Sequence, residues 1–168
     1  MNAFLFLGVF PALMAFAAAY DLTTMTIPNK LTAAVALAFI AVVAICRLPV
    51  TEVAWHLAAG LLVLTVTFAM FAAGWMGGGD AKLAAGIALW LGFADLLNYF
   101  ALASILGGIL TLGLLAARRY PLPGFLARLP WALKLHAPET GIPYGIALAI
   151  AALAVLPSAE IMLRAFPG

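Results

Sequence analysis

The chain has 168 residues, of which 67% are hydrophobic and only 8% are charged, and its mean hydropathy is +1.20. Soluble globular domains carry about 25% charged residues, so this composition excludes an ordinary soluble domain and predicts an integral membrane protein. The net charge of +2 is small and the basic residues are dispersed, which argues against nucleic acid binding. Cys46 is the single cysteine, which excludes an internal disulfide and argues against a structural zinc site, so we expect no metal and no cofactor.

The apolar residues form six runs along the chain. A membrane helix needs about 20 mostly apolar residues to cross the hydrocarbon layer. We therefore predict an all-α polytopic membrane protein, a bundle of six transmembrane helices, with residues 1–168 forming a single domain. The runs are 3–20, 31–46, 53–75, 81–95, 97–117 and 142–157.

The first three runs are well separated. Residues 1–10 contain no Lys or Arg, so the basic part of a signal peptide is missing and we expect residues 3–20 to be a retained helix. Pro28 suits the start of the second helix, because proline is favoured in a first helical turn. Thr51 is predicted to be the N-cap of the third helix.

The later runs leave two points open. The apolar stretch of the fourth run is short, so this segment is either a short helix in a locally thin membrane or a re-entrant segment. Its separation from the fifth run depends on Asp95 and Asn98. The longest connection is 118–141, where Arg128 and Lys134 interleave with apolar residues. That pattern is typical of a segment at the lipid headgroups, and an irregular basic loop explains it equally well.

The distribution of basic residues predicts the orientation in the membrane. With six spans, the connections 21–30, 76–82 and 118–141 fall on one side, and they hold six of the eight basic residues. Basic residues are enriched in the cytoplasmic loops of membrane proteins, so we expect these connections in the cytoplasm and both termini outside. The opposite side holds Arg47 and Arg164.

Two aspartates lie next to apolar runs, where a carboxylate is costly and therefore a candidate functional group. Asp21 follows the first run, and Asp80 follows the third in the sequence Gly77-Gly78-Gly79-Asp80. Two spans separate them, and two crossings return the chain to the side that it left. Both carboxyls are therefore predicted on the same membrane face, whatever the orientation.

Such a pair has a known chemistry. Two carboxyls that share a site cannot both ionise cheaply, so one holds a proton near neutral pH. The ionised carboxylate can take a proton from water as general base, and the protonated one can donate to a substrate carbonyl. The glycines before Asp80 suit this chemistry, because they leave space for an extended peptide. A flexible glycine turn with a solvated aspartate is the alternative.

Three motifs together resemble the type IV prepilin peptidase family of GxGD-type aspartyl proteases. Asp21 with Ile27-Pro28-Asn29 is similar to the first family motif, and Gly77-Gly78-Gly79-Asp80-Ala81-Lys82 is similar to the second, Gly-x-Gly-Asp-x-Lys. Ile142-Pro143-Tyr144-Gly145 is similar to the element that opens the last span. The motifs occur in the expected order, so the resemblance extends over essentially the whole chain.

The resemblance implies a peptidase that removes the short basic leader from prepilins or prepilin-like proteins at the cytoplasmic face of the bacterial inner membrane. The long enzymes of the family carry an N-terminal insertion with paired cysteines and a methyltransferase activity. This chain lacks both features and resembles the short form associated with Flp (tight-adherence) pili. The implied partners are a prepilin substrate and the lipid bilayer.

The resemblance also assigns roles to individual residues. Asp21 and Asp80 would be the catalytic pair, without separate assignment of acid and base. The active-site loop would include Gly77, Gly79 and Lys82, where Lys82 either favours an ionised carboxylate, binds headgroups or only orients the chain in the membrane. Supporting residues would be Asn29, Pro143, Tyr144 and Gly145, with Asn29 capping the second span or bonding to the Asp21 loop.

Other interpretations use the same residues differently. A small proton-coupled transporter or channel would use the two carboxyls as a relay, although both lie near one face and no inverted repeat is visible. A scaffold of a pilus machine with an inactive site is a third class. We expect His56 and His136 to be packed or solvated rather than ligands, and Asp95 to be a boundary residue at the outer face.

Overall fold

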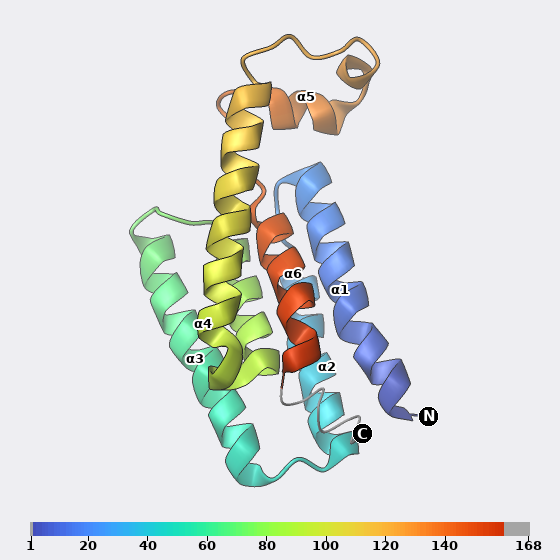
Figure 1. Ribbon diagram of the computed structural model, residues 1–168, viewed down its shortest axis with the longest axis vertical. Helices are drawn as coiled ribbons and strands as arrows, with labels where there is room; N and C mark the ends of the chain where they lie inside the picture. The colour runs from blue at the N-terminus through green and yellow to red at the C-terminus, as the bar shows by residue number, and fades with distance from the viewer. Residues whose placement is uncertain (1, 160–168) are drawn as a thin grey trace.

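The computed structural model describes residues 2–159, and within that range every regular element is a helix, which confirms the all-α prediction (Figure 1). The α-helices are α1 Asn2–Thr24, α2 Asn29–Cys46, α3 Val50–Ala72, α4 Gly78–Ala117, α5 Pro130–His136 and α6 Tyr144–Val155. Short 3-10 helices occupy Leu126–Arg128 and Leu156–Ser158.

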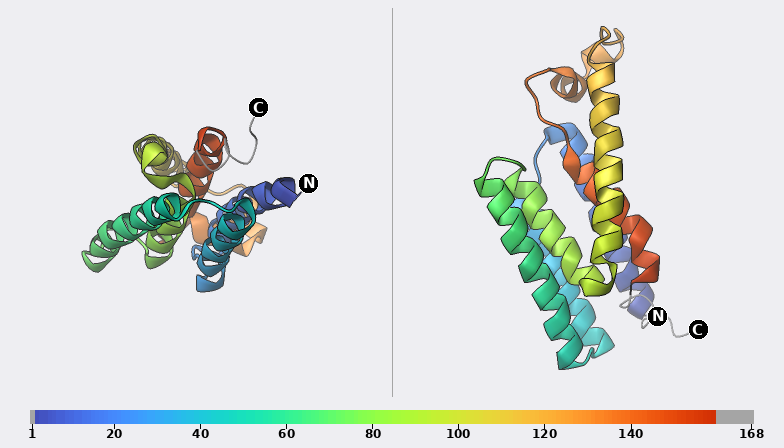
Figure 2. Two further views of the ribbon diagram at one scale, coloured as in Figure 1. Left: turned by 90° about the horizontal axis from the view of Figure 1, so that it is seen from below. Right: turned by 60° about the vertical axis from the view of Figure 1, so that its left-hand side comes forward.

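The long helices lie side by side along the long axis of the molecule, and the connections gather at its two ends (Figures 1 and 2). The α1–α2 and α3–α4 connections and the segment that contains α5 share one end, which we call the α5 end. The α2–α3 connection lies at the opposite end. α4 packs against both α3 and α6, and α1 packs against α6 and α2.

α4 folds back on itself at Gly92. Its 40 residues form one element by hydrogen bonding, but Gly92 has φ 64° and ψ −174°, a conformation that is essentially restricted to glycine. Residues 78–91, the first arm, run away from the α5 end, and residues 93–117, the second arm, return to it (Figure 2). The Nδ1 atom of His56 lies 2.7 Å from the carbonyl oxygen of Leu89, one turn before the break.

The molecule is a multi-pass membrane protein. Three helices in the described part of the chain are long and apolar enough to cross a membrane, namely α2, α3 and α4, and α6 is a shorter apolar helix. A straight helix of 40 residues would measure about 60 Å, twice the hydrocarbon thickness of about 30 Å, and the fold at Gly92 divides α4 into two antiparallel arms instead. α1, α2, α3, the two arms of α4 and α6 make the predicted bundle of six.

The core of the bundle is built around Trp90, whose side chain is fully buried. Its ring packs on that of Phe10 with a centroid distance of 4.7 Å, and its indole N–H donates to the carbonyl oxygen of Val35 at 3.1 Å. In contrast, many apolar side chains point outward, such as Leu97 with 81% of its surface exposed. An outer surface of this kind suits contact with lipid rather than with water.

Several predicted boundaries were wrong. The break between the fourth and fifth spans lies at Gly92 and not near Asp95 and Asn98, because the turn needs a positive φ rather than polarity. Asp95 lies inside the second arm, is buried, and accepts a hydrogen bond from Ser158 Oγ at 3.5 Å. Thr51 is not the N-cap of the third helix, since α3 already begins at Val50 and Pro49 holds the cap position.

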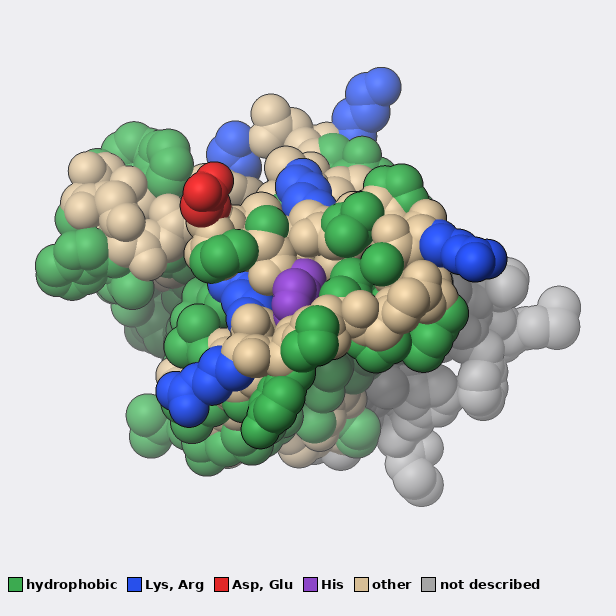
Figure 3. Space-filling model, turned by 90° about the horizontal axis from the view of Figure 1, so that it is seen from above, with side chains coloured by type: hydrophobic (Ala, Val, Ile, Leu, Met, Phe, Trp, Pro, Cys, Tyr) green, Lys and Arg blue, Asp and Glu red, His purple; other side chains and the backbone are tan. Residues whose placement is uncertain are grey.

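The connection after α4 crosses the α5 end (Figure 1). Arg118 donates from Nη2 to the carbonyl oxygens of Leu135 at 2.8 Å and Gly141 at 3.1 Å. Lys134 donates from Nζ to the carbonyl oxygen of Thr24, 2.6 Å away, and so ties α5 to the end of α1. Lys and Arg side chains are spread over this face, as Figure 3 shows. Arg164 lies outside the described residues.

Candidate active site

Asp21 lies in the last turn of α1, which extends beyond the apolar run to Thr24. Its side chain is only 4% exposed. The backbone N–H of Gly145, at the start of α6, donates to Asp21 Oδ2 at 2.8 Å. The chain leaves α1 through Met25, whose φ of 60° turns it toward the Ile27-Pro28-Asn29 motif. The first and third sequence motifs therefore meet at one carboxyl.

Asp80 lies in the first turn of α4, three residues after the N-cap Gly77. Its carboxylate accepts a hydrogen bond from the backbone N–H of Gly77. This is the contact that an acidic residue makes at the third position of a capping box, where it reaches back to the N-cap amide. The N-terminus of a helix also favours a negative charge. The local sequence thus explains how Asp80 is held.

The structure brings the two aspartates to one cleft at the α5 end of the bundle. The cleft has a volume of about 310 Å³ and is lined by Asp21, residues 25–27 and residues 77–80. The two carboxyls interact electrostatically across it. The helix count predicted that both would lie on one membrane face, and the structure also supplies the lateral proximity that the count could not give.

Three glycines around the cleft are closely enclosed by neighbouring atoms. A Cβ atom at Gly145 would lie 2.7 Å from Asp21 Oδ2, and one at Gly77 would lie 3.0 Å from Asp80 Oδ2. A Cβ at Gly79 would lie 3.0 Å from Ile27 Cβ and 3.2 Å from its backbone nitrogen. At Gly79 the first and second motifs therefore pack backbone against backbone, with little room for a side chain.

Lys82 and Asn29 bind each other rather than the aspartates. Lys82 Nζ donates to Asn29 Oδ1 at 2.8 Å. Asn29 is the first residue of α2, whose N-cap is Pro28 without a side-chain cap bond, so Asn29 does not cap the helix as expected. The pair joins the first motif to the second on the outside of the cleft, which places both residues in supporting positions.

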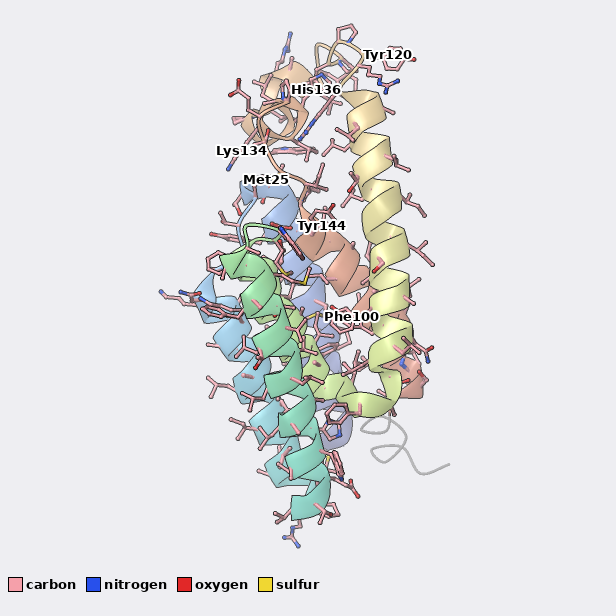
Figure 4. All side chains as sticks on the ribbon, turned by 90° about the vertical axis from the view of Figure 1, so that its left-hand side faces the viewer. Met25, Phe100, Tyr120, Lys134, His136 and Tyr144 are labelled. Atoms are coloured by element: carbon pink, nitrogen blue, oxygen red, sulfur yellow. The ribbon has the colours of Figure 1, made fainter. Side chains whose placement is uncertain are left out.

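The third motif contributes backbone and packing. Pro143 is fully buried at the N-cap of α6. The Tyr144 hydroxyl lies 3.0 Å from Thr111 Oγ1, and its ring lies against Gly107 in the second arm of α4. Tyr144 points toward this arm in Figure 4. It lines an apolar cavity together with Asp80, and its hydroxyl is already bonded to Thr111.

Tyr99 was missed by the sequence analysis. Its side chain is fully buried, and its hydroxyl is the single buried side-chain polar atom without a hydrogen-bond partner among the described side chains, residues 8–159. It interacts electrostatically with Asp80. A tyrosine in an apolar span gives no sign in one sequence that it lies near a carboxyl. Thr67 was also missed, and its hydroxyl donates to the carbonyl oxygen of Ala81 at 3.2 Å.

The remaining polar residues behave as packing groups. His56 is buried, as predicted, and its ring also contacts Phe39 at a centroid distance of 5.5 Å. His136 ends α5. Across the described ranges, no three His, Cys, Asp or Glu side chains gather as metal ligands would.

Comparison with known proteins gives a match to a protein family. A model of the type IV leader peptidase family matches residues 8–112, which include both aspartates and the first two motifs. No curated protein and no solved structure matches the chain significantly. The matched segment covers more than half of the sequence and contains the cleft described above. The chain therefore belongs to the type IV leader peptidase family, a family of membrane peptidases.

Proposed function

We propose that this protein is a membrane-embedded aspartyl endopeptidase in which Asp21 and Asp80 are the catalytic pair. The observation that supports the proposal is the single cleft that both carboxyls line, at the end of the bundle where the family motifs gather. The two acids come from helices that are distant in sequence, and they interact electrostatically across the cleft of about 310 Å³.

The proposed reaction is hydrolysis by an activated water. The ionised carboxylate takes a proton from the water, which attacks the carbonyl carbon of the scissile amide, and the protonated carboxyl donates to the carbonyl oxygen. Collapse of the tetrahedral intermediate then breaks the C–N bond, and the leaving amine takes a proton from the pair. The acid and base roles belong to the pair as a unit.

Backbone amides support this chemistry. The N–H of Gly145 fixes one oxygen of Asp21, and the N–H of Gly77 fixes the Asp80 carboxylate. A neutral N–H orients a carboxyl without adding a full positive charge beside it. Each acid can therefore gain or lose a proton while keeping its position, as the reaction requires.

The proposed substrates are prepilins or prepilin-like proteins, with the Flp type suggested by the resemblance to the short form of the family. The enzyme would remove a short basic leader on the cytoplasmic side of the inner membrane. The predicted orientation agrees with this, because the α5 end carries the cleft together with six basic residues, namely Lys30, Lys82, Arg118, Arg119, Arg128 and Lys134.

The experiment is leader removal by the purified protein in liposomes, with a prepilin that carries a basic leader, a glycine and an apolar helix. We expect Asp21→Asn and Asp80→Asn each to lower the cleavage rate at least about 10³-fold, because each removes a proton-transfer group of the pair. Asp95→Asn is the matched control, since Asp95 is also a buried acid but lies outside the cleft. It should cleave within a few-fold of the unchanged protein.

Thermal unfolding in detergent would show that all three variants are folded. Full cleavage by either Asp21→Asn or Asp80→Asn would overturn the proposed pair.

A further inference from the structure

An apolar groove begins at Asp80 and runs along the bundle away from the α5 end. It consists of two adjoining cavities of about 450 and 490 Å³, which share Thr67, Met70 and Phe100. Asp80 and Tyr144 line the first cavity, and Phe93 and Leu97 line the second. We call this continuous depression the lateral groove. Figure 4 shows Tyr144 nearer its α5 end and Phe100 farther along.

The walls of the lateral groove are α3 on one side and the second arm of α4 on the other. On the second arm, the lining residues nearest the site are small, namely Ala103, Ser104, Gly107 and Gly108. A Cβ atom added at Gly108 would meet no atom within 4 Å, so the groove is unfilled at this position. Small residues of this kind let one membrane helix approach another closely.

The groove is long enough to bind one helix, and its rim is exposed. From Phe93 to Gly108 the second arm rises about 22 Å, which matches some 15 residues of a facing α-helix. The rim residues Leu62, Val66 and Leu97 are 51%, 52% and 81% exposed. The groove is therefore open sideways at membrane depth, where a substrate helix can enter from the lipid.

We propose that the lateral groove binds the apolar helix that directly follows the cleavage site of the substrate, an inference that rests on the proposed function. A helix in this groove would end at Asp80, and the preceding residues would continue into the cleft that also contains Asp21. The scissile bond would then lie between the two carboxyls, and the leader would leave on the α5 end. The site thus recognises an apolar helix joined to a polar leader.

The first test fills the groove. Gly108→Trp places an indole in open space inside the groove, so it should block the helix without disturbing the fold. We expect kcat/KM for a helix-bearing prepilin to fall at least about tenfold, mainly through KM, because a steric block acts against binding. Gly113→Trp is the matched control, because Gly113 lies on the same arm in open space but does not line the groove.

Gly113→Trp should cleave within about twofold of the unchanged protein. Equal cleavage by the two Trp variants would overturn the proposal while leaving the proposed function intact. Failure of the unchanged protein to cleave any prepilin would instead count against the proposed function.

The second test traps the helix in place. In a Cys46→Ser, Asp21→Asn background, Ser104→Cys should form a disulfide with a cysteine in the first turns of the substrate helix. Ile109→Cys, on the same arm and exposed but outside the groove, should not. Cross-linking between two enzyme copies through Ser104→Cys would show a second copy in the groove and would overturn the proposal. Equal trapping at both positions, or none at either, would also overturn it, with lipid as the remaining occupant.

Discussion

At the scale of single residues, the two carboxyls are oriented by backbone N–H groups and by glycines, whose lack of a side chain lets the backbone approach closely. Gly145 donates to Asp21, Gly77 donates to Asp80, and Gly79 allows the backbone of the second motif to touch Ile27. Lys82, the basic residue of the second motif, donates its hydrogen bond to Asn29 rather than to either aspartate. The glycines of the motifs therefore determine where the acids lie.

Gly145→Ala tests this role of glycine. The added Cβ would lie 2.7 Å from Asp21 Oδ2 and 2.8 Å from Ile27 Cδ1, so Asp21 must shift. A displacement of about 1 Å can lower catalysis about 10²-fold, and we expect a loss of kcat of roughly that size in the liposome assay. Gly141→Ala, where a Cβ meets no atom within 4 Å, serves as the control. Equal activity of the two variants would contradict this account.

Tyr99 supplies a second test at this scale. A buried hydroxyl without a partner costs about 1–3 kcal/mol, so Tyr99→Phe should leave the free energy of unfolding unchanged or raise it by up to that amount. Tyr144→Phe should have the opposite effect, because it removes the hydrogen bond between Tyr144 and Thr111. We expect it to lower the free energy of unfolding by about 0.5–1.5 kcal/mol. Thermal unfolding in detergent measures both. A lower stability of Tyr99→Phe would show that the hydroxyl has a partner in the membrane.

The sequence was sufficient to predict some of these residues and not others. Asp21 and Asp80 stand out because carboxylates are rare beside apolar runs, and the glycines stand out through their spacing from Asp80. The contacts of Gly145 with Asp21 and of Lys82 with Asn29 join segments 124 and 53 residues apart. Such pairings depend on lateral helix packing, on which hydropathy carries no information. Tyr99 was missed for the same reason.

At the scale of elements, the apolar runs predicted which segments are helical but placed one turn wrongly. Hydropathy marks where a chain leaves the membrane, so it predicts the break at Asp95 and Asn98. The actual turn needs the backbone freedom of Gly92 and the bond between His56 and Leu89. A turn that depends on one dihedral angle and one tertiary hydrogen bond cannot be predicted from the pattern of polar and apolar residues.

Gly92→Ala tests the hairpin. Alanine disfavours the φ and ψ of this position by about 1–3 kcal/mol, and its Cβ would lie 3.1 Å from the His56 ring. We expect the free energy of unfolding in detergent to fall by that amount. Gly113→Ala should instead raise it by about 0.5–1 kcal/mol, because Gly113 lies in open space in a helix. Similar effects at the two glycines would argue against a turn at Gly92.

At the scale of the whole molecule, counting crossings predicted one shared face for both aspartates, since parity depends only on the number of spans, and the two aspartates line one cleft. The order of helices around the bundle was not predicted, because packing of α1 against α6 joins the two ends of the chain. The basic residues alone predict the orientation in the membrane, which cysteine labelling can measure.

Cysteine labelling would provide that measurement. In a Cys46→Ser background, Glu139→Cys lies exposed at the α5 end, and Thr51→Cys lies exposed at the opposite end. An impermeant maleimide should label Glu139→Cys only in inverted vesicles and Thr51→Cys only in intact spheroplasts, because the basic end is expected in the cytoplasm. The reverse pattern would place the cleft outside and would exclude prepilin leaders as substrates.

The first arm of α4 has a consequence for biosynthesis. Its 14 residues, 78–91, reach only about 21 Å, less than the hydrocarbon layer of about 30 Å. An isolated segment of that length does not hold itself across a bilayer, so we expect the translocon to release it only together with residues 93–117. Nascent chains that are stopped between the two arms should therefore be extracted from the membrane by alkali. Asp80, which lies on the first arm, would reach its final depth in the membrane only after the second arm has been synthesised.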